Sequence, residues 1–207
     1  MFAINLDSFK ATPLKIDPYQ YLIVPNFLVT TAITAIDRDY PRIEKAGSFP
    51  LETLSYGKAF SDLIEELKGP EIRQAFEEKF HTDLKNKPTT ITVRGHCQKK
   101  DGKIHNDSKT KIITVLLYMN VDWAQTGGRL RILRSANSLE NFAEEVTPQV
   151  GTLVAFKRND LSFHGHKTFT GKRRVIQMNW VSTPAANIRE ISRHKISAWM
   201  KSIFSSI

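Results

Sequence analysis

Apolar residues recur at helical spacing in the first part of the chain. Between residues 56 and 67 the apolar side chains stand three or four positions apart, as on one face of an α-helix. Pro70 opens a second segment of this kind, because proline is favoured in the first turn of a helix. Residues 27–40 form another candidate helix. The pattern therefore predicts helical support over about residues 26–82.

From about residue 88 the period shortens to two. Runs of β-branched and aromatic residues are separated by turn residues, as in short strands. The strands expected in this part of the chain cover residues 90–93, 111–119, 129–133, 153–156, 161–166 and 174–181. One earlier strand is expected over residues 19–24. Residues 94–103 are expected to be a loop, and residues 135–146 a loop or short helix. The pattern predicts a mainly β protein with flanking helices, built on a double-stranded β-helix (a cupin-like jelly roll) over about residues 88–182.

The last segment, about residues 185–207, is predicted to be a helix. An imperfect apolar stripe would pack on the barrel or on a second subunit, so a homodimer is one expectation; its residues are Ile188, Ile191, Trp199 and Ile203. A chain of this length has the size of one domain, and we expect residues 1–207 to form a single one.

Composition narrows the setting in which the chain works. Hydrophobic residues make up 41% of the chain and charged residues 25%, an ordinary balance for a soluble globular protein. Cys97 is the single cysteine, so no internal disulfide can form. The N-terminus lacks a basic region followed by an apolar run. These features favour the cytoplasm. No uncharged apolar stretch approaches the length of a membrane span, so no membrane partner is expected.

The formal charge of +9 comes from 30 basic and 21 acidic side chains. Such an excess can attract an anionic ligand. The basic residues are scattered, however, and they do not alternate with aromatic residues as in a groove for single-stranded nucleic acid. We expect no nucleic-acid partner.

Three side chains form a candidate metal site. His105 and Asp107 stand two positions apart, so on a strand both would lie on one face. His164 or His166, which also stand two apart, would supply a third ligand. Two histidines and one carboxylate form the facial triad that binds non-haem Fe(II) and leaves coordination positions open.

A candidate anion-binding residue follows on the strand expected over residues 174–181. Arg174 would share one face of that strand with Ile176, Met178 and Trp180, which indicates an inward apolar face with one buried charge. The planar fork of an arginine pairs well with a buried carboxylate. Arg173 would then face outward and be solvated.

Together these residues resemble a known family over about residues 88–182. The motifs that carry the resemblance are His105-x-Asp107, Trp123 with Gly127-Gly128-x-Leu130, Pro148-x-x-Gly151 and the residues up to Phe156, Ser162-Phe163-His164-Gly165-His166, and Gly171-x-x-Arg174. The segment is similar to the 2-oxoglutarate- and Fe(II)-dependent dioxygenases of the prolyl 4-hydroxylase-like branch. That resemblance implies iron ligands His105, Asp107 and His164. The family spacing of ten residues selects His164 over His166 and assigns Arg174 to the distal carboxylate of 2-oxoglutarate.

The resemblance also implies a reaction. An unactivated C–H bond of a peptide, prolyl or otherwise, or of a small molecule would be hydroxylated, with release of succinate and carbon dioxide and with ascorbate as reductant. Asp107 argues against the related halogenases, in which a small residue replaces the carboxylate. Trp180 stands where the related nucleobase demethylases carry a second arginine.

Two other classes of function fit part of this pattern. A non-catalytic cupin-like metal-binding or sensor domain would use the same three ligands, but it has no need of a buried arginine. A zinc hydrolase with a His/Asp/His site would need a general base near the metal, and the sequence suggests none.

Overall fold

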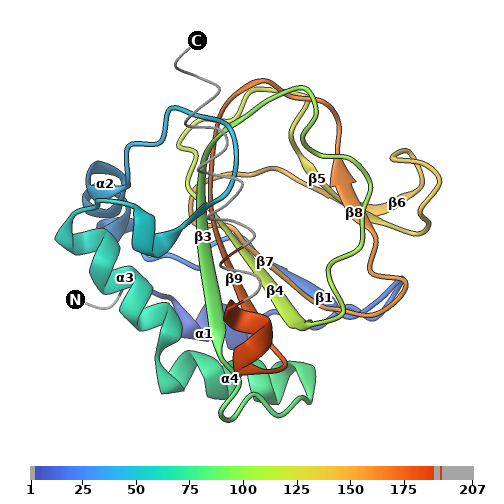
Figure 1. Cartoon of the computed structure of the whole chain (residues 1–207), viewed down its shortest axis with the longest axis horizontal. Helices are drawn as coiled ribbons and strands as arrows, with labels where there is room; N and C mark the ends of the chain where they lie inside the picture. Colours follow the sequence, from blue (N-terminus) through green and yellow to red (C-terminus); the bar gives the residue numbers. More distant parts are fainter. Residues whose placement is uncertain (1–2, 189–191, 193–207) are drawn as a thin grey trace.

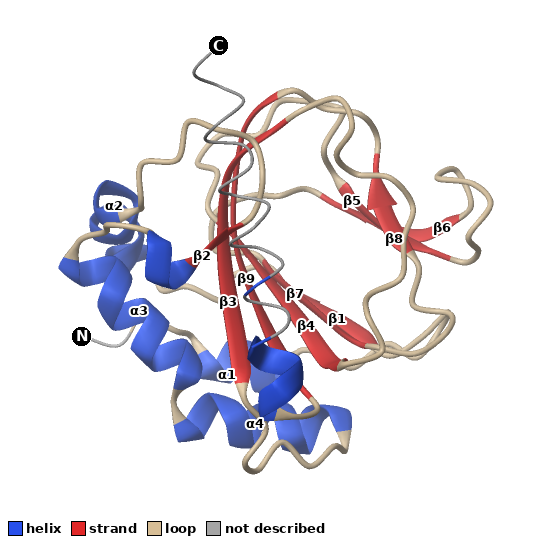
Figure 2. Ribbon diagram, viewed as in Figure 1, coloured by secondary structure: helices blue, strands red, loops and turns tan. Residues whose placement is uncertain are grey.

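The computed structural model describes residues 3–188 and 192. Its helices lie almost entirely in the first 80 residues and pack on one side of a large β-sheet (Figures 1 and 2). The helices are α1 (Leu6–Ala11), α2 (Thr30–Asp39), α3 (Lys58–Lys68) and α4 (Pro70–Phe80), with a short 3-10 helix, η1 (Leu51–Thr53). Pro70 occupies the first turn of α4, as its fixed φ angle favours.

Two antiparallel sheets face one another. The large sheet has the strand order β1-β7-β4-β9-β3-β2, and the small sheet the order β6-β5-β8. The strands are β1 (Tyr21–Val24), β2 (Phe49–Pro50), β3 (Thr89–Cys97), β4 (Lys111–Tyr118), β5 (Leu130–Leu133), β6 (Phe142–Val146), β7 (Leu153–Lys157), β8 (His164–His166) and β9 (Gly171–Val181). The jelly-roll prediction is confirmed by this arrangement. None of the described helices is long and apolar enough to span a membrane.

The large sheet is buried on both faces, and a separate apolar cluster covers each. On the helix side, Ile176, Met178 and Trp180 of β9 pack in one cluster with Phe76 of α4. On the other side, Val175 of β9 joins a second cluster that lies between the two sheets. Because side chains alternate along a strand, β9 contributes to both clusters. The second cluster adjoins the cavity described below.

Several local expectations are wrong. Residues 142–146 form strand β6, not a loop or short helix. Strand β3 continues to Cys97 instead of ending near residue 93, past a register shift between Arg94 and His96. The short helix α1 was not expected. A helix begins at residue 184, and the rest of the helix expected over 185–207 lies outside the described residues, apart from residue 192.

Candidate metal centre and adjoining cavity

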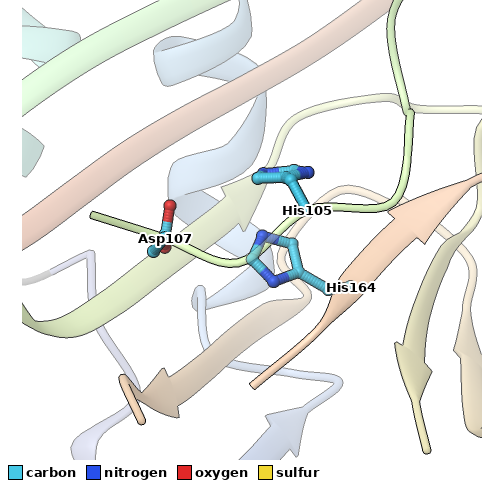
Figure 3. Close-up of side chains that lie close together, drawn as sticks. All are labelled: His105, Asp107 and His164. Atoms are coloured by element: carbon cyan, nitrogen blue, oxygen red, sulfur yellow. The ribbon is translucent and has the colours of Figure 1, made fainter. Parts of the chain in front are cut away.

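The connection between β3 and β4 brings His105 and Asp107 to the start of β8, where His164 lies (Figure 3). His105 and His164 form an isolated antiparallel bridge, in which each backbone N–H donates to the other residue's carbonyl over 3.0 Å. Each of the three side chains has one possible ligand atom within 4.8 Å of the others. His105 and Asp107 lie in the connection and not on a regular strand, and a single bridge at His105 brings them to the site.

Both histidines are oriented by backbone carbonyls. Nδ1 of His105 lies 2.9 Å from the carbonyl oxygen of Lys103, and Nδ1 of His164 lies 3.0 Å from that of Ser162. A carbonyl only accepts, so each Nδ1 is the donating nitrogen of its ring, and Nε2 is the nitrogen left to bind a metal. Burial lowers the pKa of His164 to about 4, although the nearby carboxylate of Asp107 opposes this shift. His164 is therefore neutral at physiological pH, as a metal ligand must be.

The carboxylate of Asp107 is held by two side chains. One oxygen accepts from Nζ of Lys111 at 2.7 Å and the other from the hydroxyl of Thr114 at 2.5 Å. Burial by itself would raise the pKa of Asp107. The attraction of Lys111 and His164 and the two hydrogen bonds outweigh it and leave the pKa below its usual range. Two imidazoles and one carboxylate form a donor set that fits Fe(II).

A cavity of about 120 Å³ adjoins the three ligands. Among its other lining residues are Arg94, Thr114, Leu116, Leu130, His166, Arg173, Val175 and Gln177. Arg173 is 5% exposed and donates from Nε to the carbonyl of Gly128 at 2.8 Å. Its guanidinium lies 5.3 Å from the ring centre of Tyr118. The cavity thus joins a candidate metal centre to a buried guanidinium.

The expectation that Arg174 faces this cavity is wrong. Arg174 points to the opposite side of β9, where it forms an ion pair with Asp37 of α2 and lies 4.8 Å from the ring centre of Tyr40. It does share a face with Ile176, Met178 and Trp180, as the alternation predicts, but that face is covered by helices. Arg173, expected to be solvated, is the buried arginine of the cavity.

The second histidine of β8 also lines the cavity without joining the metal cluster. Nδ1 of His166 lies 2.9 Å from the carbonyl oxygen of Lys167. Burial lowers the pKa of His166 to about 4. The three-residue cluster includes His164 instead. His164 therefore stays the better candidate ligand on geometry.

The sequence reasoning missed Lys111 and Thr114. Both lie in the first half of β4, and the signal that could have shown them is a lysine and a threonine within an otherwise apolar strand that is buried on both faces. The side chain of Lys111 is only 9% exposed, and a lysine this buried needs a partner.

We expect Lys111→Met to bind divalent metal more tightly than the wild type, by at least about tenfold. The ammonium competes with the metal for an oxygen of Asp107, and it repels a dication placed nearby. Titration of Mn(II) into metal-free protein, followed by calorimetry, would measure the change. Lys111→Arg keeps the charge and serves as the control. Weaker metal binding by Lys111→Met would show that Lys111 orients the carboxylate and does not compete for it.

Comparison with known proteins gives one family and a set of related folds. A sequence model of the 2OG-Fe(II) oxygenase superfamily matches residues 74–182, slightly more than half of the chain. No curated protein sequence matches.

Solved structures with a similar fold include a prolyl-4-hydroxylase from Pseudomonas putida, at 15% identity and a TM-score of 0.55 over 86% of this chain and 97% of that one. A prolyl 4-hydroxylase from Phytophthora capsici matches at 15% identity and a TM-score of 0.56, over 90% of this chain and 68% of that one. The viral collagen prolyl hydroxylase of Paramecium Bursaria Chlorella virus-1, in a 2OG complex, matches at 12% identity and a TM-score of 0.53, over 78% of this chain and 96% of that one. At these identities the likeness shows a shared fold.

Proposed function

The chain belongs to the 2OG-Fe(II) oxygenase superfamily and is a 2-oxoglutarate-dependent dioxygenase, and from this premise we propose that it hydroxylates an unactivated C–H bond of a peptide or small-molecule substrate. The cosubstrates are 2-oxoglutarate and dioxygen, and the proposed co-products are succinate and carbon dioxide. The observation that carries the proposal is the joining of three candidate iron ligands and Arg173 in one cavity.

In this proposal His105, Asp107 and His164 hold Fe(II). When bound, the iron supplies the reductive activation of dioxygen that no amino-acid side chain can provide. The protein's part is to present two imidazoles and one carboxylate and to keep the reacting groups in one small cavity. Asp107 completes the ligand set, which supports hydroxylation over halogenation.

Arg173, in place of Arg174, is proposed to bind the distal carboxylate of 2-oxoglutarate. A carboxylate in this cavity would be costly to bury without a partner. The guanidinium donates from Nε to the Gly128 carbonyl at 2.8 Å and from Nη2 to the hydroxyl of Tyr118 at 3.5 Å, and N–H groups of Nη1 and Nη2 remain for a two-point contact with a carboxylate. The bond to Tyr118 and the bond to Gly128 together hold the guanidinium in place beside the cavity.

Peptidyl proline is the first substrate class to test. The three solved structures above are named as prolyl hydroxylases. The opposing explanations, a zinc hydrolase or a metal sensor, predict no decarboxylation of 2-oxoglutarate.

We expect the Fe(II)-loaded protein to convert 2-oxoglutarate to succinate slowly without substrate, and faster when a proline-containing peptide or a small molecule is accepted. Quantifying succinate and the oxidised product by mass spectrometry would test this. Ascorbate should extend the reaction by keeping the iron reduced, and N-oxalylglycine should compete with 2-oxoglutarate. A protein that holds Zn(II) tightly and yields no succinate with any substrate would contradict the proposal.

A further inference from the structure

Residues 98–110, here called the lysine loop, carry two of the candidate metal ligands and an unusual set of charges. Lys99, Lys100, Lys103 and Lys109 are all exposed. Residues 94–111 hold six basic and two acidic side chains, so this short stretch contributes +4 of the chain's +9. This stretch beside the metal centre therefore carries four of the nine net positive charges.

The acidic residues of this stretch are already engaged. Asp101 pairs with Arg94 at 3.3 Å and accepts from the backbone N–H of Gln98. Asp107 pairs with Lys111. Within the part of the chain that the structure describes, none of the four exposed lysines has an acidic partner. Their positive charge is thus free to act on a ligand.

Cations elsewhere on the surface often have acidic neighbours. Such pairs include Lys15 with Glu144, Lys58 with Asp62, Arg73 with Glu77, Arg134 with Asp17, and Lys167 with Glu140. In each of these pairs the acidic side chain offsets the positive charge of its partner. The four exposed lysines of the lysine loop keep their positive charge.

The lysine loop is held against the site. The carbonyl of Gly102 accepts from the backbone N–H of His166 at 2.9 Å, and Gly102 itself lines the cavity. The carbonyl of Lys103 fixes the ring of His105. In Figure 1 the connection from β3 to β4 passes beside β8, in agreement with the bridge between His105 and His164. Lys103 therefore lies between two residues that line the cavity, Gly102 and His105, and Lys99 and Lys100 lie in the turn just before them.

We propose that the lysine loop binds an acidic polypeptide segment, whose Glu and Asp side chains flank the residue that is oxidised. The inference rests on the proposed function and names a substrate class for it. Charge complementarity favours such a partner, since unpaired cations around a cleft raise the local concentration of an anionic ligand.

Two other anions fit the loop less well. Residues 94–111 contain no Phe, Tyr or Trp, so the loop offers no surface on which nucleic-acid bases could stack. In the proposed function, Arg173 meets the charge of 2-oxoglutarate inside the cavity, and none of the four lysines lines that cavity.

The test is binding of fluorescein-labelled peptides to protein saturated with Mn(II) and N-oxalylglycine. The probes are one peptide of alternating Glu and Pro, one of alternating Lys and Pro, and an oligothymidylate. We expect the Glu–Pro peptide to bind most tightly and to weaken as salt is raised. The triple variant Lys99→Glu, Lys100→Glu, Lys103→Glu should weaken it by at least about tenfold.

A matched variant controls for net charge. Lys10→Glu, Lys85→Glu, Lys87→Glu changes the total charge equally at lysines outside the loop, and it should bind the Glu–Pro peptide as the wild type does. Equal affinity of the wild type for the Glu–Pro and Lys–Pro peptides would overturn the proposal, even if the triple variant failed to fold. Tighter binding of the oligothymidylate through the same lysines, or a loss in the triple variant confined to N-oxalylglycine, would also overturn it. If the wild type forms succinate but has no preference for acidic peptide, this inference fails while the proposed function stands.

Discussion

Arg173→Ala is expected to weaken binding of 2-oxoglutarate by roughly 30-fold to several-thousand-fold, with little change in metal affinity. Removing one partner of a buried, hydrogen-bonded charge pair typically costs about 2–5 kcal/mol, and each 1.4 kcal/mol or so is a factor of ten. Arg173 is the buried arginine of the cavity, and it is not one of the three candidate ligands, so its substitution leaves the metal centre in place. Titration of 2-oxoglutarate into oxygen-free, Fe(II)-loaded protein, followed through the metal-to-ligand charge-transfer band, would measure the loss.

The neighbouring arginine provides the matched control. Arg174→Ala should leave the affinity for 2-oxoglutarate within a few-fold of the wild type and lower the free energy of unfolding by about 1 kcal/mol, because it removes a partly exposed ion pair with Asp37. Arg173→Lys should be intermediate in cosubstrate affinity, since it keeps the charge and loses the planar fork. A large cosubstrate effect in Arg174→Ala with none in Arg173→Ala would show that the other face of β9 binds the carboxylate.

Substitution of each candidate ligand by alanine should reduce Fe(II) or Co(II) affinity by more than about 100-fold and abolish turnover, because changes that only touch the surroundings of metal ligands already cost 10- to 100-fold. Calorimetric titration with Co(II) would measure the loss of metal affinity, and an assay of succinate formation would measure the loss of turnover. The variants to test are His105→Ala, Asp107→Ala and His164→Ala.

The second histidine of β8 is the control for these variants. His166→Ala should retain most of the metal affinity, because His166 lies outside the three-residue cluster. Asp107→Ala should also unfold more readily, since it leaves the buried ammonium of Lys111 unpaired. Full metal binding by His164→Ala together with loss in His166→Ala would reverse the ligand assignment.

The choice of the wrong arginine has a definite physical origin. Alternation along residues 174–181 predicts correctly which side chains share a face, but it does not say which face a helix covers. On an exposed sheet, hydrophobicity would answer that question. Here both faces of β9 are buried, with Val175 at 4% and Ile176 at 1% exposure, so the two faces look alike in sequence. Asp37, the partner that draws Arg174 to the helix side, lies 137 residues earlier in the chain.

The candidate metal ligands were easier to predict because their signal is chemical and not positional. Two histidines and an aspartate of the right types suffice to suggest a facial triad, whether His105 and Asp107 lie on a strand or in a connection. The polar neighbours of Asp107 gave no such signal. Lys111 and Thr114 become part of the site only when the β4 strand is placed beside the preceding segment.

The way the three ligands are supported decides how this centre can be tuned by mutation. The rings of His105 and His164 are fixed by backbone carbonyls, each two residues before the histidine, and backbone groups are not altered by ordinary side-chain substitution. The carboxylate of Asp107, by contrast, depends on the side chains of Lys111 and Thr114. Selection or engineering for a different metal, or for a different metal affinity, therefore has its most direct access through these two positions.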